Sequence, residues 1–264
     1  MKKILLLVTV FALTAFTVSA QPWAKEKLSK SPRHGEWVKV KNGDREVDCF
    51  VTYPEVKDKA TAVIVIHEIF GLTDWVRGVT DQLAEAGYIA IAPDLLSGKG
   101  SSTEELVKKG EDVGKAIRAL PNDQITGDLN AVADYVTGLP SCDGKLAVAG
   151  FCWGGGQSFR YATNNKKLKA ALVFYGPAPE SKSDLEKINC PVYGFYGEND
   201  NRINAGIPKT TEQMKEASKT YDPKIYHEAG HGFMRAGEDP AGNKANKDAR
   251  EEGWKRVKDV LKKI

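Results

Sequence analysis

The sequence predicts an α/β fold in which a mostly parallel central sheet carries helices on both faces. Two observations lead to this prediction. Short runs of continuous apolar, β-branched residues recur along the chain, and segments with helical spacing of apolar residues separate them. The alternation of strands and helices indicates parallel pairing. No repeat, low-complexity tract or linker divides the chain, so we expect residues 21–264 to form a single domain.

The first element departs from this alternation. Residues 35–53 alternate apolar and polar side chains around Asn42-Gly43, which predicts a hairpin at an edge of the sheet. The buried strands then follow in order, at residues 62–66, 88–92, 145–151, 170–175, 192–196 and 224–227. Helices are predicted at residues 75–86, 103–120, 123–137, 208–218 and 246–263. The Gly/Ser-rich residues 97–103 are typical of a loop.

Residues 1–20 have the layout of a secretory signal peptide. Lys2 and Lys3 precede an apolar run over residues 4–16, and small residues before Gln21 supply a cleavage site. The run is short for a membrane span, although a retained N-terminal anchor is the alternative. We therefore expect an exported protein, periplasmic or secreted, without membrane association after cleavage.

The composition excludes several classes of protein. A composition of 41% hydrophobic and 28% charged residues argues against a disordered chain and against an integral membrane protein. The net charge is only +3, and its basic residues are interleaved with acidic ones, which indicates a solvated surface and no nucleic-acid partner. We expect a monomer that acts on a small molecule.

The candidate nucleophile is Cys152, in the segment Gly150-Phe151-Cys152-Trp153-Gly154-Gly155 at the end of a predicted strand. A nucleophile elbow needs a strand, a sharp turn that carries Ser or Cys, and a helix directly after it. Glycines flank the turn because its backbone segments approach too closely for a Cβ. The N-terminus of the following helix favours a thiolate. The alternative is a buried structural cysteine.

In the α/β-hydrolase fold, an acid and a histidine follow the nucleophile in chain order. Asp200 and Glu198 both lie just after a predicted strand, and we prefer Asp200 because it lies deeper in the loop. His231 lies between two glycines in a later loop. The pattern predicts a triad of Cys152, His231 and Asp200. Such a triad cleaves a carboxylic ester or lactone through a thioester acyl-enzyme, without a cofactor.

Two alternative functions remain open. His227-Glu228-Ala229-Gly230-His231 spells the H-E-x-x-H pattern of zinc peptidases, which requires both histidines on one face of a helix. Glycines lower the helix propensity here, so we take the match as accidental and expect no metal site. A zinc-dependent hydrolase that uses His227 and His231 is nevertheless one alternative. The other is a non-catalytic binding protein on the hydrolase fold.

The number of cysteines limits how many disulfide bonds the chain can form. An exported chain with four cysteines invites pairing. If Cys152 is catalytic, Cys49, Cys142 and Cys190 can form at most one disulfide, and the sequence does not say which.

Several segments together resemble the dienelactone hydrolase family of the α/β-hydrolase fold. They are Glu68-Ile69-Phe70-Gly71, Pro93-Asp94-Leu95, the Cys152 segment, the Asp200 loop and His231-Gly232-Phe233, in the family's order. The resemblance implies the same triad. It also implies that Glu68 contacts and activates the cysteine, and that the backbone N–H groups of Ile69 and Trp153 form the oxyanion hole.

The substrate residues match less completely. Family members that act on dienelactone hold its carboxylate with two arginines. Arg235 matches one of them, but Gly98 stands where the other is expected. The export signal is a second departure, because the aromatic-degrading members work in the cytoplasm. The resemblance therefore implies an ester or lactone substrate and argues against dienelactone itself.

Overall fold

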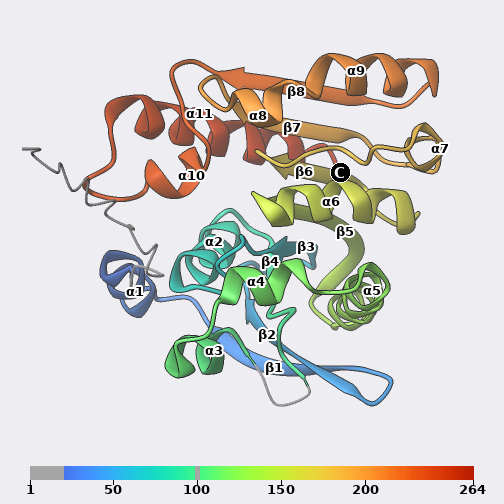
Figure 1. Cartoon of the computed structure of the whole chain (residues 1–264). Helices are drawn as coiled ribbons and strands as arrows, with labels where there is room; N and C mark the ends of the chain where they lie inside the picture. Colours follow the sequence, from blue (N-terminus) through green and yellow to red (C-terminus); the bar gives the residue numbers. More distant parts are fainter. Residues whose placement is uncertain (1–20, 99–101) are drawn as a thin grey trace, which may run out of the picture.

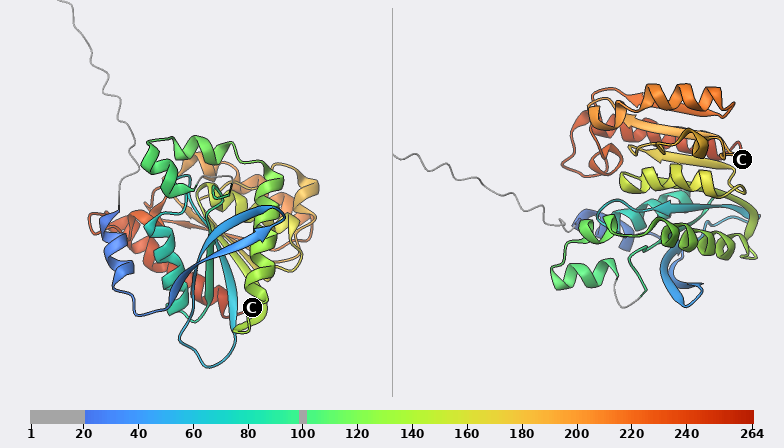
Figure 2. Two further views of the ribbon diagram at one scale, coloured as in Figure 1. Left: turned by 90° about the horizontal axis from the view of Figure 1, so that it is seen from below. Right: turned by 45° about the vertical axis from the view of Figure 1, so that its right-hand side comes forward.

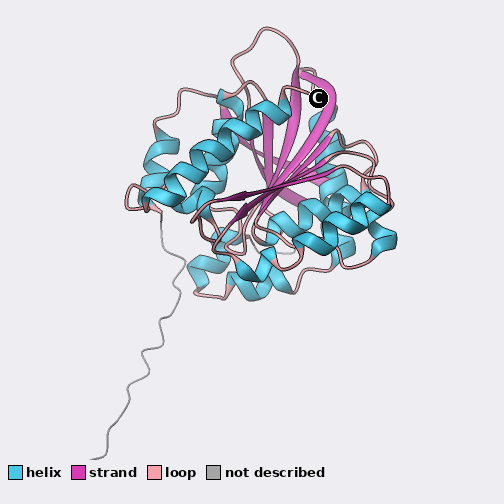
Figure 3. Ribbon diagram, turned by 90° about the horizontal axis from the view of Figure 1, so that it is seen from above, coloured by secondary structure: helices cyan, strands magenta, loops and turns pink. Residues whose placement is uncertain are grey.

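An eight-stranded sheet forms the centre of the molecule in a computed structural model that describes residues 21–98 and 102–264 (Figures 1 and 3). The strand order is β1-β2-β4-β3-β5-β6-β7-β8. The β1–β2 and β2–β4 pairs are antiparallel, and the five other pairs are parallel. The strands are β1 Gly35–Asn42, β2 Arg45–Thr52, β3 Ala60–Ile66, β4 Ile89–Pro93, β5 Cys142–Phe151, β6 Ala170–Phe174, β7 Val192–Gly197 and β8 Tyr221–Tyr226. The predicted fold class is confirmed.

Helices cover both faces of the sheet, as Figure 3 shows from above. The helices are α1 Pro22–Ser29, α2 Asp74–Glu85, α3 Thr103–Lys109, α4 Val113–Arg118, α5 Asn122–Thr137, α6 Trp153–Asn164, α7 Lys182–Leu185, α8 Asn201–Asn204, α9 Ile207–Glu216, α10 Phe233–Ala236 and α11 Lys244–Leu261. Side chains alternate across each strand, so Ile64 and Ile66 pack with α5 and α6. Val63 and Val65 pack with α2 and α11 on the opposite face.

The edge hairpin forms as predicted, with Asn42 and Arg45 on either side of a turn in which Gly43 has φ +59°. Arg45 donates to the carboxylate of Asp128 at 2.9 Å, and Asp128 is completely buried on α5. This ion pair fixes the hairpin against α5. Figure 2 shows the course of the hairpin strands in two further views.

One predicted helix is wrong in its extent. Residues 103–120 form two short helices, α3 and α4, instead of one. Gly110 ends α3 in the left-handed conformation at φ +69°, and the Asp112 side chain caps α4 by accepting from the N–H of Lys115. Helix α1 and the short helices α7, α8 and α10 have no counterpart among the predicted elements.

The predicted signal peptide lies outside the described residues. Within residues 21–98 and 102–264, no helix has the length and apolar character needed to cross a membrane. All four cysteines carry free thiols, and Cys49, Cys142 and Cys190 are buried. The parallel strands all end at one edge of the sheet, where the loops after β3, β5, β7 and β8 meet.

Candidate active site

Cys152 lies in a strained turn between β5 and α6. Its backbone has φ +57° and ψ −114°, a conformation that residues with a side chain rarely adopt. Its N–H donates to the carbonyl of Phe174 on β6 at 3.0 Å, and its own carbonyl accepts from Gly155 and Gly156 in the first turn of α6. The side chain is half-buried at the N-terminus of α6. Strain of this kind persists where the surrounding structure enforces it.

The glycines around Cys152 are required by backbone contacts. A Cβ on Gly150 would lie 1.9 Å from the carbonyl oxygen of Gly154, and one on Gly154 would lie 2.4 Å from the carbonyl oxygen of His67. Both distances are far below van der Waals contact, so no residue with a side chain fits there. The close approach lets α6 start directly over the ends of β3 and β5.

The structure places Asp200, and not Glu198, against His231. The Nδ1 atom of His231 lies 2.5 Å from Oδ2 of Asp200, and the Asp200 side chain is 6% exposed. Asp200 follows β7 and His231 follows β8, and the N–H of Asn199 donates to the carbonyl of Ala229, which joins the two loops. The carboxylate of Glu198 instead accepts from the N–H of Glu228.

The H-E-x-x-H segment is not a helix. Residues 227–232 form turns, in which Glu228 has φ +53°. Nδ1 of His227 lies 2.7 Å from the carboxylate of Glu198, whereas His231 bonds to Asp200. The two histidines therefore have separate carboxylate partners and do not share one face of a helix. Of the described residues, no group of three or more His, Cys, Asp or Glu side chains is placed to hold a metal ion.

Glu68 is buried beside Arg235. Its Oε2 accepts from Nε of Arg235 at 2.7 Å, and the guanidinium lies 5.2 Å from the centre of the Phe70 ring. Burial raises the pKa of Glu68, and the charge of Arg235 opposes that rise. The resemblance gave Glu68 a contact with the cysteine and Arg235 a contact with substrate. In the structure their hydrogen bond joins these two side chains to each other.

The two expected oxyanion donors lie on either side of Cys152. Ile69 is in the turn after β3, where Glu68 and Gly71 form an isolated bridge. Trp153 is the first residue of α6. Helices leave their first N–H groups without internal partners. Neither the Ile69 nor the Trp153 N–H has an acceptor in the described part of the chain, so both are free for a ligand oxygen.

Tyr175 is a site residue that the sequence did not reveal. It follows β6 with φ +39°, is completely buried, and its ring lies edge-on to the His231 ring at 5.0 Å between centroids. Burial raises the pKa of its hydroxyl well above the ordinary value. The sequence carries no signal for this residue: it places Tyr175 at the end of a predicted strand, and backbone strain cannot be read from residue type.

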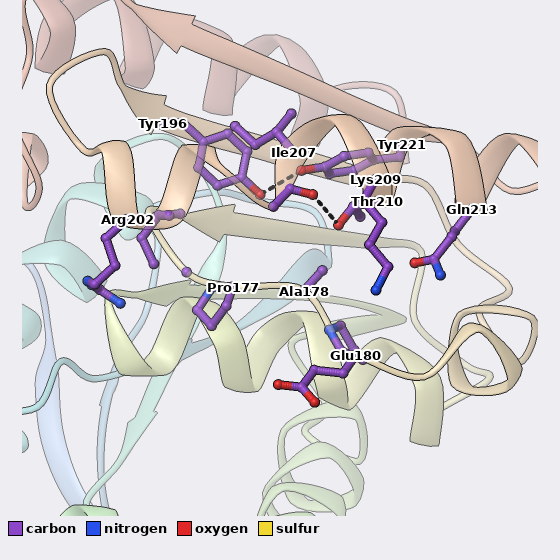
Figure 4. Close-up of a pocket in the computed structure, with 14 residues that line it drawn as sticks. Pro177, Ala178, Glu180, Tyr196, Arg202, Ile207, Lys209, Thr210, Gln213 and Tyr221 are labelled. Carbon is purple, nitrogen blue, oxygen red and sulfur yellow. Dashed lines mark hydrogen bonds between the residues drawn. The ribbon is translucent and has the colours of Figure 1, made fainter.

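A separate cavity of about 220 Å³ lies between residues 176–180 and helices α8 and α9 (Figure 4). The hydroxyls of Tyr196 and Tyr221 share a hydrogen bond of 2.8 Å inside it. Its lining contains neither Cys152 nor His231. The cavity is therefore distinct from the cluster of predicted catalytic residues.

The protonation of His231 makes stability depend on pH. Burial lowers the pKa of His231, but its interactions with Cys152 and Asp200 outweigh that effect and raise the pKa from 6.5 to about 9. The folded protein therefore holds this proton more tightly than the unfolded chain does. The resulting stabilisation is complete below pH 6.5 and is lost as the pH rises toward 9.

We expect His231→Gln to lower the free energy of unfolding more at about pH 6 than at about pH 9.5. Urea unfolding of both proteins at the two pH values measures the difference. An equal loss at both values would contradict the raised pKa.

Comparisons with known proteins bear on the family and the fold of this chain. The sequence model described as "Dienelactone hydrolase family" matches residues 47–264. A relative from Methylorubrum extorquens, named "Putative carboxymethylenebutenolidase", is 30% identical over 260 residues, covering 93% of this chain and 88% of its own. A relative of the same name from Escherichia coli is 32% identical over 213 residues, 76% of each chain. Among solved structures, a "Putative Dienelactone Hydrolase" from Klebsiella pneumoniae matches with a TM-score of 0.75 and 25% identity, covering 88% of this chain and 99% of that one.

Proposed function

The chain belongs to the dienelactone hydrolase family and is a carboxylic ester hydrolase, and from that premise we propose that it cleaves a neutral ester or lactone with Cys152 as nucleophile. One observation carries the proposal: Cys152, at the N-terminus of α6, interacts with His231. This interaction helps to raise the pKa of that histidine. His231 in turn bonds to the buried carboxylate of Asp200.

The proposed reaction is acyl transfer through a thioester. The Cys152 thiolate attacks the substrate carbonyl carbon, and the oxygen that becomes negative is bound by the N–H groups of Ile69 and Trp153. The His231 imidazolium, held by Asp200, gives its proton to the leaving alkoxide. Neutral His231 then takes a proton from water, and the resulting hydroxide attacks the thioester and releases the acid and the thiolate.

Two features support a neutral substrate. Gly98 has φ +82°, and a Cβ there would lie 2.9 Å from the carbonyl oxygen of Glu46. An arginine at this position would collide with the hairpin, so the second carboxylate-binding arginine has no place here. The remaining candidate, Arg235, has its charge matched by Glu68. An added substrate carboxylate would thus meet one arginine that is already paired.

Hydrolysis of matched substrates tests the proposal. A short neutral ester and the same ester with a free carboxylate on its acyl chain differ only in charge. We expect kcat/KM to be at least about tenfold higher for the neutral ester, and a slow ester to leave Cys152 acylated, as seen by mass spectrometry of the intact protein and its peptides. Preference for the acidic ester would overturn the substrate assignment, and turnover with acylation at another residue would overturn the nucleophile.

Export is a further part of the proposal. The charged start and apolar run of residues 1–20 support it. Cell fractionation with a C-terminal tag should place a protein that starts at Gln21 outside the cytoplasm. A cytoplasmic protein that keeps residues 1–20 would refute it.

A further inference from the structure

His67 is buried beside the two segments that carry the proposed oxyanion donors, and the mechanism above does not use it. It follows β3 directly and precedes Glu68 and Ile69 in the turn. Its side chain has no exposed surface. A polar side chain that is completely buried requires hydrogen-bond partners, and those of His67 are specific.

The two ring nitrogens of His67 have opposite roles. Nδ1 lies 2.8 Å from the carbonyl oxygen of Glu68, and Nε2 lies 3.4 Å from the backbone nitrogen of Leu95. A carbonyl oxygen can only accept, so Nδ1 carries the proton and donates to it. The Leu95 N–H can only donate, so Nε2 accepts. Both bonds require the same neutral tautomer. Burial lowers the pKa of His67, which agrees with a neutral ring.

The hydrogen bond to the Glu68 carbonyl acts on the proposed oxyanion donor. The carbonyl of Glu68 and the N–H of Ile69 belong to one planar trans peptide unit, in which they point in opposite directions. The Glu68 carbonyl accepts from His67 on one side and from the N–H of Gly71 at 3.1 Å. With the oxygen held twice, the peptide plane cannot rotate, and the Ile69 N–H stays directed away from His67. Hydrogen bonds to the oxygen also polarise the N–H.

The ring of His67 also contacts the second donor segment. It stacks on the Trp153 ring with 5.4 Å between centroids and 14° between planes. Its own carbonyl oxygen is among the backbone atoms that exclude a Cβ at Gly154. One residue therefore touches the β3 turn and the first turn of α6, which are the two segments that bring the N–H groups of Ile69 and Trp153 together.

We propose that His67 is a positioning residue for the oxyanion hole, because its Nδ1–H holds the Glu68 carbonyl and so orients the Glu68–Ile69 peptide. The proposal rests on the acyl-transfer function above. It assigns His67 no proton transfer and no contact with substrate.

Two substitutions separate the hydrogen bond from the stacking. His67→Asn keeps an N–H donor near the Nδ1 position but loses the ring, and His67→Phe keeps the ring but loses the donor. Both lose the acceptor for Leu95, so they are matched in that respect. We expect kcat to fall about 10- to 100-fold in His67→Phe with KM within about twofold of the wild-type value, and to be largely restored in His67→Asn. If the phenylalanine variant does not fold, His67→Leu provides the variant without a donor.

Two inhibitors identify the step affected. An aldehyde analogue of the substrate forms a thiohemiacetal whose oxygen occupies the oxyanion hole, so its affinity should fall in His67→Phe by the same factor as kcat/KM. Alkylation of Cys152 by iodoacetamide needs no oxyanion hole, so its rate should match the wild type in both variants. Wild-type kcat in His67→Phe, or equal losses in the two variants, would overturn the positioning role. Slower alkylation would likewise overturn it, because the thiolate would then be the group affected. Failure of the hydrolase function itself would appear separately, as full activity in a variant without the Cys152 thiol.

Discussion

Cys152→Ala is expected to lower kcat/KM for ester hydrolysis by about 10⁴-fold or more, while the protein stays folded. Alanine removes the sulfur atom that forms the thioester in the proposed reaction. It keeps the Cβ, so the backbone at φ +57° carries the same strain before and after the change. The midpoint of thermal unfolding should move by no more than about 4 °C. Steady-state hydrolysis and circular dichroism measure the two quantities on the same sample.

Cys190→Ala is the matched control. Cys190 is 6% exposed in the core packed by α5 and α6, and burial raises the pKa of its thiol to about 12. Its removal should cost stability, about 1 kcal/mol, and leave kcat/KM unchanged. In the native protein, iodoacetamide should modify Cys152 and spare the buried Cys49, Cys142 and Cys190. Wild-type rates in Cys152→Ala would exclude this residue as the nucleophile.

Asp200→Asn should lower kcat by about 10² to 10⁴-fold with little change in the fold. The amide has nearly the shape of the carboxylate but no charge, and it can donate a hydrogen bond to Nδ1 of His231. That donation would favour the tautomer with its proton on Nε2, the atom that must accept protons during deacylation. The loss of the carboxylate also removes one cause of the raised pKa of His231. Measuring kcat across pH separates the two effects, because only the second shifts the profile.

Glu198→Gln is the comparison that the acid loop itself offers. Glu198 precedes Asp200 by two positions, but its side chain contacts His227 and the N–H of Glu228. We expect its activity to stay within about threefold of the wild type. A large loss in Glu198→Gln combined with activity in Asp200→Asn would reverse the assignment of the acid.

Local residue patterns were sufficient to predict the sheet and the elbow. Strands β3, β4 and β6 and residues 146–151 of β5 are mostly apolar and fully buried, so residue type alone identifies them. The two glycines that flank Cys152, Gly150 and Gly154, are likewise a local signal. At each of them a nearby backbone segment leaves no room for a Cβ. The split between α3 and α4 was missed because Gly110 is tolerated within an apolar helical pattern, and only its left-handed conformation ends the helix.

The partners of the site residues were less predictable. Glu68 and Arg235 are 167 residues apart, and neither residue type indicates the other as its partner. Choosing Asp200 over Glu198 from the sequence rested on depth in a loop, whereas the structure distinguishes them by which carboxylate reaches His231. Tyr175 stood in no motif, and His67 preceded the Glu68-Ile69-Phe70-Gly71 segment without a role of its own. Their positions become meaningful only when the ends of β3, β5, β6 and β8 are brought together.

The position of β8 at the edge of the sheet affects how the enzyme loses activity on heating. This strand is the last in the sheet, pairs only with β7, and is partly exposed along most of its length. The free energy needed to open such a region locally is lower than the free energy needed to open the core. Because His231 follows β8, local opening at this edge would carry the histidine away from Cys152 while the centre of the sheet remains intact. Heat inactivation would then precede global melting and reverse on cooling, and amide hydrogen exchange would be faster in β8 than in the central strands β3 and β5.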